Sequence, residues 1–171
     1  ELQAHPELLN HELQGELKMA QRLMVGGHLG DSAFFRQQID EFMKEARFLE
    51  MRGGEVFADP EAVAFLAKLS LETKRAQQIR LDLTTNLTTL TDFHLEILNG
   101  FRRGTIKCSI DGFAEENEYI RYPSKWSTVV ENLQRLRHLH KGWSKVVQAT
   151  VSVYQICTLY RLFWFLDEFV K

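Results

Sequence analysis

Histidines and carboxylates are the residues of this chain whose spacing could most directly support catalysis or metal binding. A di-metal site in a helical bundle needs the pattern Glu-x-x-His on inward-facing helix positions, and none of the six histidines has an acid three positions before it. His138 and His140 are two residues apart, so on a helix they point to different faces. No Ser-His-Asp or Cys-His arrangement follows from the spacing. The sequence therefore predicts a non-enzymatic protein without a metal or a cofactor.

A basic row is the clearest candidate for binding a charged partner. Arg137, Lys141 and Lys145 are spaced by four residues, so they would line one face of a helix. Such a row can contact the phosphates of lipid or nucleic acid, or an acidic protein surface. Three cations are few for a polyanion, and the formal net charge is −2. We expect no nucleic-acid partner, and favour pairing of the row with the acidic residues that are in excess over residues 1–61.

An aromatic segment near the C-terminus is the second candidate for partner binding. Residues 160–166 are apolar around nearly the whole circumference of a helix, and a single neighbouring helix could not cover them. Because Tyr, Trp and Arg dominate protein–protein hot spots, Tyr160, Arg161 and Trp164 are candidate interface residues. An ordinary core role is the alternative. A membrane-spanning helix is not predicted, since polar residues recur between positions 146 and 170.

The cysteines and the start of the chain bear on its compartment. Two cysteines do not form a disulfide scaffold. Cys157 lies on an apolar helical stripe and is expected to be buried, whereas Cys108 lies in an expected loop. The chain begins at Glu1 without an apolar leader. We therefore expect a cytoplasmic domain that is part of a longer protein.

A seven-residue repeat gives the strongest signal for the fold. Its members are all apolar and run from residue 62 to residue 97: Ala62, Leu69, Ala76, Leu83, Leu90 and Ile97. Such a repeat keeps one stripe of a long helix against a partner helix. Asp59 and Pro60 offer an N-cap and a first helical residue, and no glycine follows until Gly100. The threonine-rich residues 83–90 would also suit a strand, but the leucine spacing favours a continuous helix over 59–99.

Other segments are predicted from the same periodicity. Apolar residues at helical spacing predict helices over 6–25 and 31–52, separated by glycines, and a long helix over 124–171. His94 lies beside the 59–99 repeat and is expected to be a hydrogen-bonded core residue or one that sets the register of helix pairing. Residues 101–123 alternate loosely and predict an inter-helix loop or a small hairpin.

Together these patterns predict a single all-α domain over residues 1–171. With 44% hydrophobic and 26% charged residues, the 171-residue chain lies in the ordinary globular range. We predict an elongated antiparallel helical bundle with coiled-coil packing between its two long helices. Its expected role is a helical scaffold for protein–protein association, self-association included. The alternative is a peripheral membrane-binding bundle that uses the basic row and the C-terminal aromatics.

Overall fold

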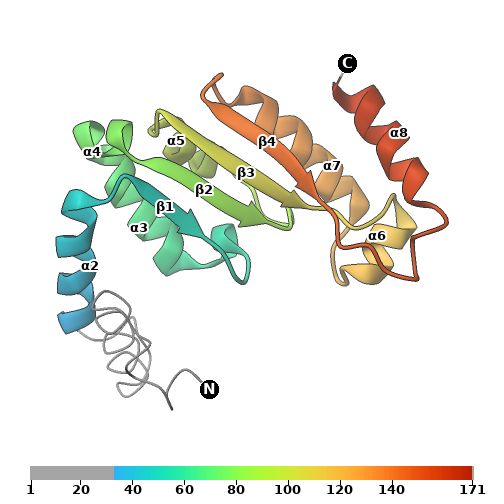
Figure 1. The fold of residues 1–171 in the computed structure, drawn as a ribbon, viewed down its shortest axis with the longest axis horizontal. Helices are drawn as coiled ribbons and strands as arrows, with labels where there is room; N and C mark the ends of the chain where they lie inside the picture. Colours follow the sequence, from blue (N-terminus) through green and yellow to red (C-terminus); the bar gives the residue numbers. More distant parts are fainter. Residues whose placement is uncertain (1–32, 171) are drawn as a thin grey trace, which may run out of the picture. The chain divides into compact units, whose positions relative to one another are not determined.

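A computed structural model describes residues 33–170 of the chain (Figure 1). The chain divides into two compact units, residues 1–45 and 46–171. In the first unit the described element is helix α2 (Ala33–Glu45). The predicted helix over 6–25 lies outside the described residues.

The second unit alternates strands and helices. Its elements are β1 (Phe48–Met51), η4 (Val56–Ala58), α3 (Pro60–Leu71), α4 (Thr73–Gln78), β2 (Arg80–Thr85), α5 (Asp92–Asn99), β3 (Arg103–Ser109), α6 (Glu115–Ile120), α7 (Trp126–Arg135), η5 (Leu136–His138), β4 (Trp143–Gln148) and α8 (Leu159–Val170). This is an α/β fold with a four-stranded parallel sheet, so the predicted all-α helical bundle and its coiled coil are wrong.

The sheet has the strand order β1-β2-β3-β4, and every neighbouring pair is parallel. Consecutive parallel strands need crossover connections, and right-handed crossovers between strands in sequential order place the helices on one face of the sheet. Figure 1 shows this arrangement, with α3, α5 and α7 behind the strands. We call this the helix-covered face, and the opposite one the open face.

The core of the second unit lies between the sheet and these helices. Alternate residues of the two central strands are fully buried there: Leu81, Leu83, Ile106 and Cys108. Helices α3 and α5 contribute buried leucines, among them Leu66 and Leu98. The indole nitrogen of Trp143 donates to the backbone oxygen of Leu98 at 3.2 Å, which fixes β4 to the end of α5.

The predicted continuous helix over 59–99 is wrong, because strand β2 separates helices α3 and α4 from helix α5. Its predicted start is confirmed. Asp59 accepts hydrogen bonds from the backbone nitrogens of Glu61 and Ala62, and Pro60 is the first helical residue. Helix α3 ends at Leu71, and the threonine-rich residues 83–90 contain the end of strand β2 and the loop after it. Thr84 and Thr85 adopt the extended backbone that β-branched residues prefer. Five members of the repeat are buried, each in a different segment: Leu69, Ala76, Leu83, Leu90 and Ile97.

Three further segments differ from the predictions. The predicted helix over 31–52 is wrong in its C-terminal part, because residues 48–51 form strand β1 and pair with β2. Residues 101–123, expected to be a loop or small hairpin, contain the central strand β3 and helix α6. Residues 124–171 contain β4 between α7 and α8, so the helical spacing there did not reflect one helix.

The cysteine environments are the reverse of those expected. Cys108 is buried in β3, and Cys157 is exposed before α8; both thiols are free. Among residues 33–170, every helix is too short or too polar to cross a lipid bilayer.

Candidate ligand site at the carboxyl edge of the sheet

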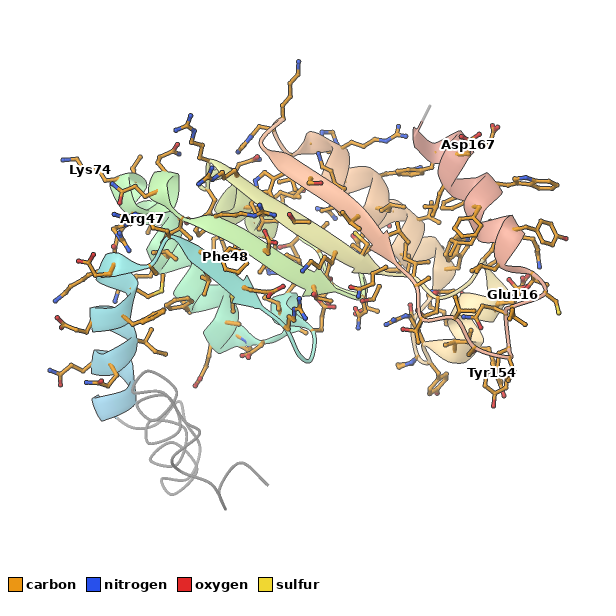
Figure 2. All side chains as sticks on the ribbon, in the orientation of Figure 1. Arg47, Phe48, Lys74, Glu116, Tyr154 and Asp167 are labelled. Carbon is orange, nitrogen blue, oxygen red and sulfur yellow. The ribbon has the colours of Figure 1, made fainter. Side chains whose placement is uncertain are left out.

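The predicted aromatic interface residues have different environments. Tyr160 and Trp164 are exposed on α8, and their ring centroids are 5.3 Å apart. Arg161 instead has partners within the protein: its Nη1 lies 2.8 Å from Oε1 of Glu116, which Figure 2 labels, and its guanidinium lies over the ring of Phe113. Arg161 therefore fixes α8 to α6 rather than presenting a free cation.

The predicted basic row does not exist as a helical face. Arg137 lies in η5, Lys141 lies in the turn before β4, and Lys145 lies on β4 itself. The side chain of Arg137 donates to the backbone oxygen of Phe169 and covers the ring of that residue. The structure therefore does not bring these three cations together along one element.

A different group of residues meets at the carboxyl edge of the sheet. Because all four strands are parallel, the loops that follow them leave the sheet at the same edge, where the arrowheads lie in Figure 1. Each loop after β1, β2 and β3 contains residues with positive φ: Gly53 and Gly54, Leu87, and Ala114. For leucine and alanine this conformation is strained, and such strain clusters at ligand-binding and active sites.

Glu55 is the central side chain of this edge. Its carboxylate accepts hydrogen bonds from Thr85 Oγ1 at 2.8 Å, from the Asn86 backbone nitrogen at 2.7 Å and from the Phe57 backbone nitrogen at 3.3 Å. The side chain thus joins the loop after β1 to the end of β2. It is half-buried, and no basic side chain of the described residues forms an ion pair with it.

The loop after β2 is held rigidly around the same carboxylate. Asn86 Oδ1 accepts from both the backbone nitrogen and the hydroxyl of Thr88, at 2.9 and 2.6 Å. Buried Leu87 has φ of 60°, and its backbone oxygen accepts from the side-chain amide of Asn132 on α7 at 2.9 Å. The side-chain amide nitrogen of Asn86, Nδ2, donates to no group in the described part of the chain. We call Glu55, Thr85, Asn86 and Thr88 the Glu55 cluster.

The pKa of the Cys108 thiol depends on its burial and on the charge of Glu55. Burial raises the pKa of the Cys108 thiol to about 12, and the Glu55 carboxylate adds to this increase. The thiol therefore stays protonated near neutral pH and is a poor nucleophile. Cys108 packs as a small apolar residue beneath the site.

The open face of the sheet adjoins this edge and is polar. Lys107 on β3 reaches across β2 to Glu50 on β1, with 2.7 Å between Nζ and Oε1. Hydrogen bonds from Lys107 and then Arg52 lower the pKa of Glu50. Arg80 pairs with the buried Asp82 at 3.0 Å. These charged groups already form ion pairs, whereas the carboxylate of Glu55 is contacted only by uncharged hydrogen-bond donors of the described residues.

A second polar group fixes the loop after β3. Asp111 Oδ2 lies 2.8 Å from Arg121 Nε, and Asp111 Oδ1 accepts from the Thr150 backbone nitrogen at 2.7 Å. The backbone nitrogen of Asp111 donates to Asn117 Oδ1 at 3.0 Å. This carboxylate is buried, so its role is to hold together the segments that follow β3 and β4.

His94 has the core role expected from the sequence. It is buried at the start of α5, its ring stacks on Phe57, and its Nδ1 accepts from the Thr91 backbone nitrogen at 3.2 Å. Burial, and then the charge of Arg135, lower the pKa of His94. The imidazole is therefore neutral at neutral pH, as an acceptor at Nδ1 must be.

No family model, curated protein or solved structure matches this chain. Within residues 33–170, no group of three or more His, Cys, Asp or Glu side chains is arranged to hold a metal ion.

The Glu55 cluster was not predicted, because its residues fall between or within the helices expected over 31–52 and 59–99. Gly53 and Gly54 directly follow the predicted helix over 31–52, and Asn86 lies within the predicted helix over 59–99. The sequence does contain a signal: segments 79–83 and 104–110 alternate apolar with polar residues, as strands do, and each is followed at once by polar residues. That order is typical of parallel strands whose loops carry binding groups.

Proposed function

We propose that the protein binds a small polar ligand at the carboxyl edge of its sheet, and that Glu55 accepts a cationic group of that ligand. In open sheets of parallel strands, ligands bind beyond the carboxyl ends of the strands. The observation that carries the proposal is the half-buried carboxylate of Glu55, which has hydrogen-bond donors around it but no cationic partner among residues 33–170.

The chemistry of the Glu55 cluster supports an amine-bearing ligand. Partial burial removes water from a carboxylate and makes its negative charge costly unless another group compensates it. An ammonium group can supply charge-assisted hydrogen bonds to the remaining lone pairs of Glu55. The side-chain amide nitrogen of Asn86 can donate to an oxygen of the same ligand.

Matched ligand pairs and variants test this function. Putrescine is compared with 1,4-butanediol, and alanine with lactate, by following the backbone amide signals of Phe57 and Asn86 in NMR spectra. We expect the amines to shift both signals and the hydroxyl compounds to leave them unchanged. Glu55→Gln should abolish the shifts. Glu50→Gln is the matched control, because Glu50 already pairs with Lys107 and Arg52, and it should retain them.

If none of the amines shifts these signals, or if Glu55→Gln responds as the parent does, then Glu55 does not recognise a cation. A glutamine side chain has one acceptor oxygen, whereas both carboxylate oxygens of Glu55 accept hydrogen bonds. Thermal unfolding of each variant must therefore first show that the fold is retained.

A second function is supported by the surface of α8. We propose that Tyr160, Phe163 and Trp164, which are 52%, 60% and 69% exposed, mediate association with a second copy of the chain. These residues lie at three- and four-residue spacing and so form one stripe. The opposite side of α8 already packs in the core through Leu162 and Phe165. Exposed aromatic stripes of this kind mark interaction sites.

Light scattering tests this association. A double variant, Tyr160→Ala with Trp164→Ala, should have a lower mass than the parent at the same concentration, because the main contacts are removed. Leu71→Ala is the control, since Leu71 is exposed at the far end of α3. A parent that is monomeric, or a double variant with unchanged mass, would reject this function.

We also propose a cytoplasmic location, where a reducing environment would keep the free thiols of Cys108 and Cys157 unpaired.

A further inference from the structure

Strand β4 is the last strand in the sheet order, and its outer side pairs with no strand of the described residues. The ladder to β3 shows which of its backbone groups are free. The oxygens of Gly142 and Gln148 accept from Gly104 and Ile110 of the β3 side, at 3.2 and 3.1 Å. In a parallel ladder the residues that bond to one neighbour alternate with those that face away. The backbone N–H and C=O groups of Lys145 and Val147 therefore point outward.

The outer edge of β4 is accessible over most of its length. Ser144, Lys145 and Val146 are exposed, and Val147 is half-buried. The strand contains neither a proline nor a positive-φ residue that would interrupt pairing. An edge of this kind offers a template on which another extended segment can add by backbone hydrogen bonds.

The outer edge of β4 is positively charged, and this charge determines which kind of extended segment can pair with it. Lys145 has no carboxylate partner among residues 33–170, and neither has Lys141 in the turn before the strand. By contrast, Lys107 on the neighbouring strand is paired with Glu50. Opposite charges on adjacent strands stabilise their pairing and like charges oppose it. The edge therefore favours a segment with carboxylates.

The same lysine disfavours a second copy of β4 as the occupant. In a two-fold antiparallel pairing centred anywhere between residues 144 and 146, the two Lys145 side chains would occupy directly opposite or diagonal positions. Such positions lie roughly 5–8 Å apart, so the two ammonium groups would repel each other. Self-association through this edge is thus opposed, in contrast to the association proposed for α8.

We propose that β4 accepts an extended acidic segment of another protein as a fifth strand, with a carboxylate of that segment beside Lys145. Backbone hydrogen bonds to Lys145 and Val147 supply the pairing, and the lysine supplies the preference for acidic sequences. This interaction surface is separate from the Glu55 cluster and does not depend on ligand binding there.

The test uses two synthetic peptides with fluorescent labels, one of alternating glutamate and valine and one of alternating lysine and valine. Fluorescence anisotropy measures binding to the full chain, and hydrogen exchange reports the amides of β4. We expect the acidic peptide to bind saturably and to slow exchange at Lys145 and Val147. Binding of both peptides alike, or binding without protection of these two amides, would overturn the proposal.

Two variants with a matched control locate the contact. Lys145→Glu changes an exposed side chain, so the fold should persist, and it should weaken the acidic peptide by about tenfold or more. Val147→Pro removes an outward-pointing N–H without removing a bond to β3, and should also weaken binding by about tenfold. Val147→Ala keeps the N–H and should bind like the parent. Unchanged binding by Lys145→Glu, or a dimer of the free chain that Val147→Pro dissociates, would reject the acidic segment as the occupant.

Discussion

Gly104→Ala is expected to lower the free energy of unfolding by about 3 kcal/mol or more, because the added methyl group cannot be accommodated in the sheet. A Cβ at this position would lie 2.0 Å from the backbone oxygen of Leu81 and 2.5 Å from Cζ3 of Trp143. The first of these atoms belongs to the backbone of the neighbouring strand, so relief requires β2 to move away from β3.

The position of Gly104 explains the size of this effect. Gly104 pairs with Leu81 on one side and with Trp143 on the other, so it joins three of the four strands. The indole of Trp143 occupies the space that a side chain would take, and its nitrogen is fixed by Leu98. A smaller residue at 143 would therefore relieve the contact with the ring and leave the contact with β2.

Urea unfolding followed by circular dichroism measures the loss. Ser144→Ala is a suitable control, because Ser144 is exposed on the next strand and should change stability by less than about 0.5 kcal/mol. If Gly104→Ala unfolds at the same urea concentration as the control, the register between β2, β3 and β4 is not as described.

The local signals in the sequence were better guides than the long-range one. Asp59 and Pro60 start a helix as predicted, because an N-cap and a first-turn proline act within a few residues. His94 is buried and hydrogen-bonded as expected. The seven-residue repeat failed because any α/β chain recurrently buries leucines, and the spacing of Leu83 and Leu90 across a strand and a loop mimicked a helix.

The candidate site could not be predicted from spacing, because its residues meet only through the parallel sheet. Glu55 and Thr85 are 30 residues apart in sequence, and the hydrogen bond between them depends on β1 and β2 ending at the same edge. Positive φ at Leu87 depends on tertiary contacts, among them the hydrogen bond from Asn132. Once helix was assigned across residues 83–90, none of these contacts could be inferred.

Asp111→Ala is expected to lower the free energy of unfolding by about 3 kcal/mol, since it leaves a half-buried cation without its partner. Arg121 would lose the carboxylate 2.8 Å away, and the Thr150 backbone nitrogen would lose its acceptor. The loss should be smaller for Asp111→Asn, because an amide oxygen can still accept one of these bonds. Glu115→Ala, at an exposed position on α6, serves as the control.

A double-variant cycle separates the ion pair from the rest of this effect. If the uncompensated charge of Arg121 causes most of the loss, then adding Arg121→Met to Asp111→Ala should restore part of the stability, and the two changes will not be additive. Urea unfolding of all four proteins at one pH and salt concentration gives the coupling. Strict additivity, or a loss below about 0.5 kcal/mol for Asp111→Ala, would show that Asp111 does not hold the segments after β3 and β4 together.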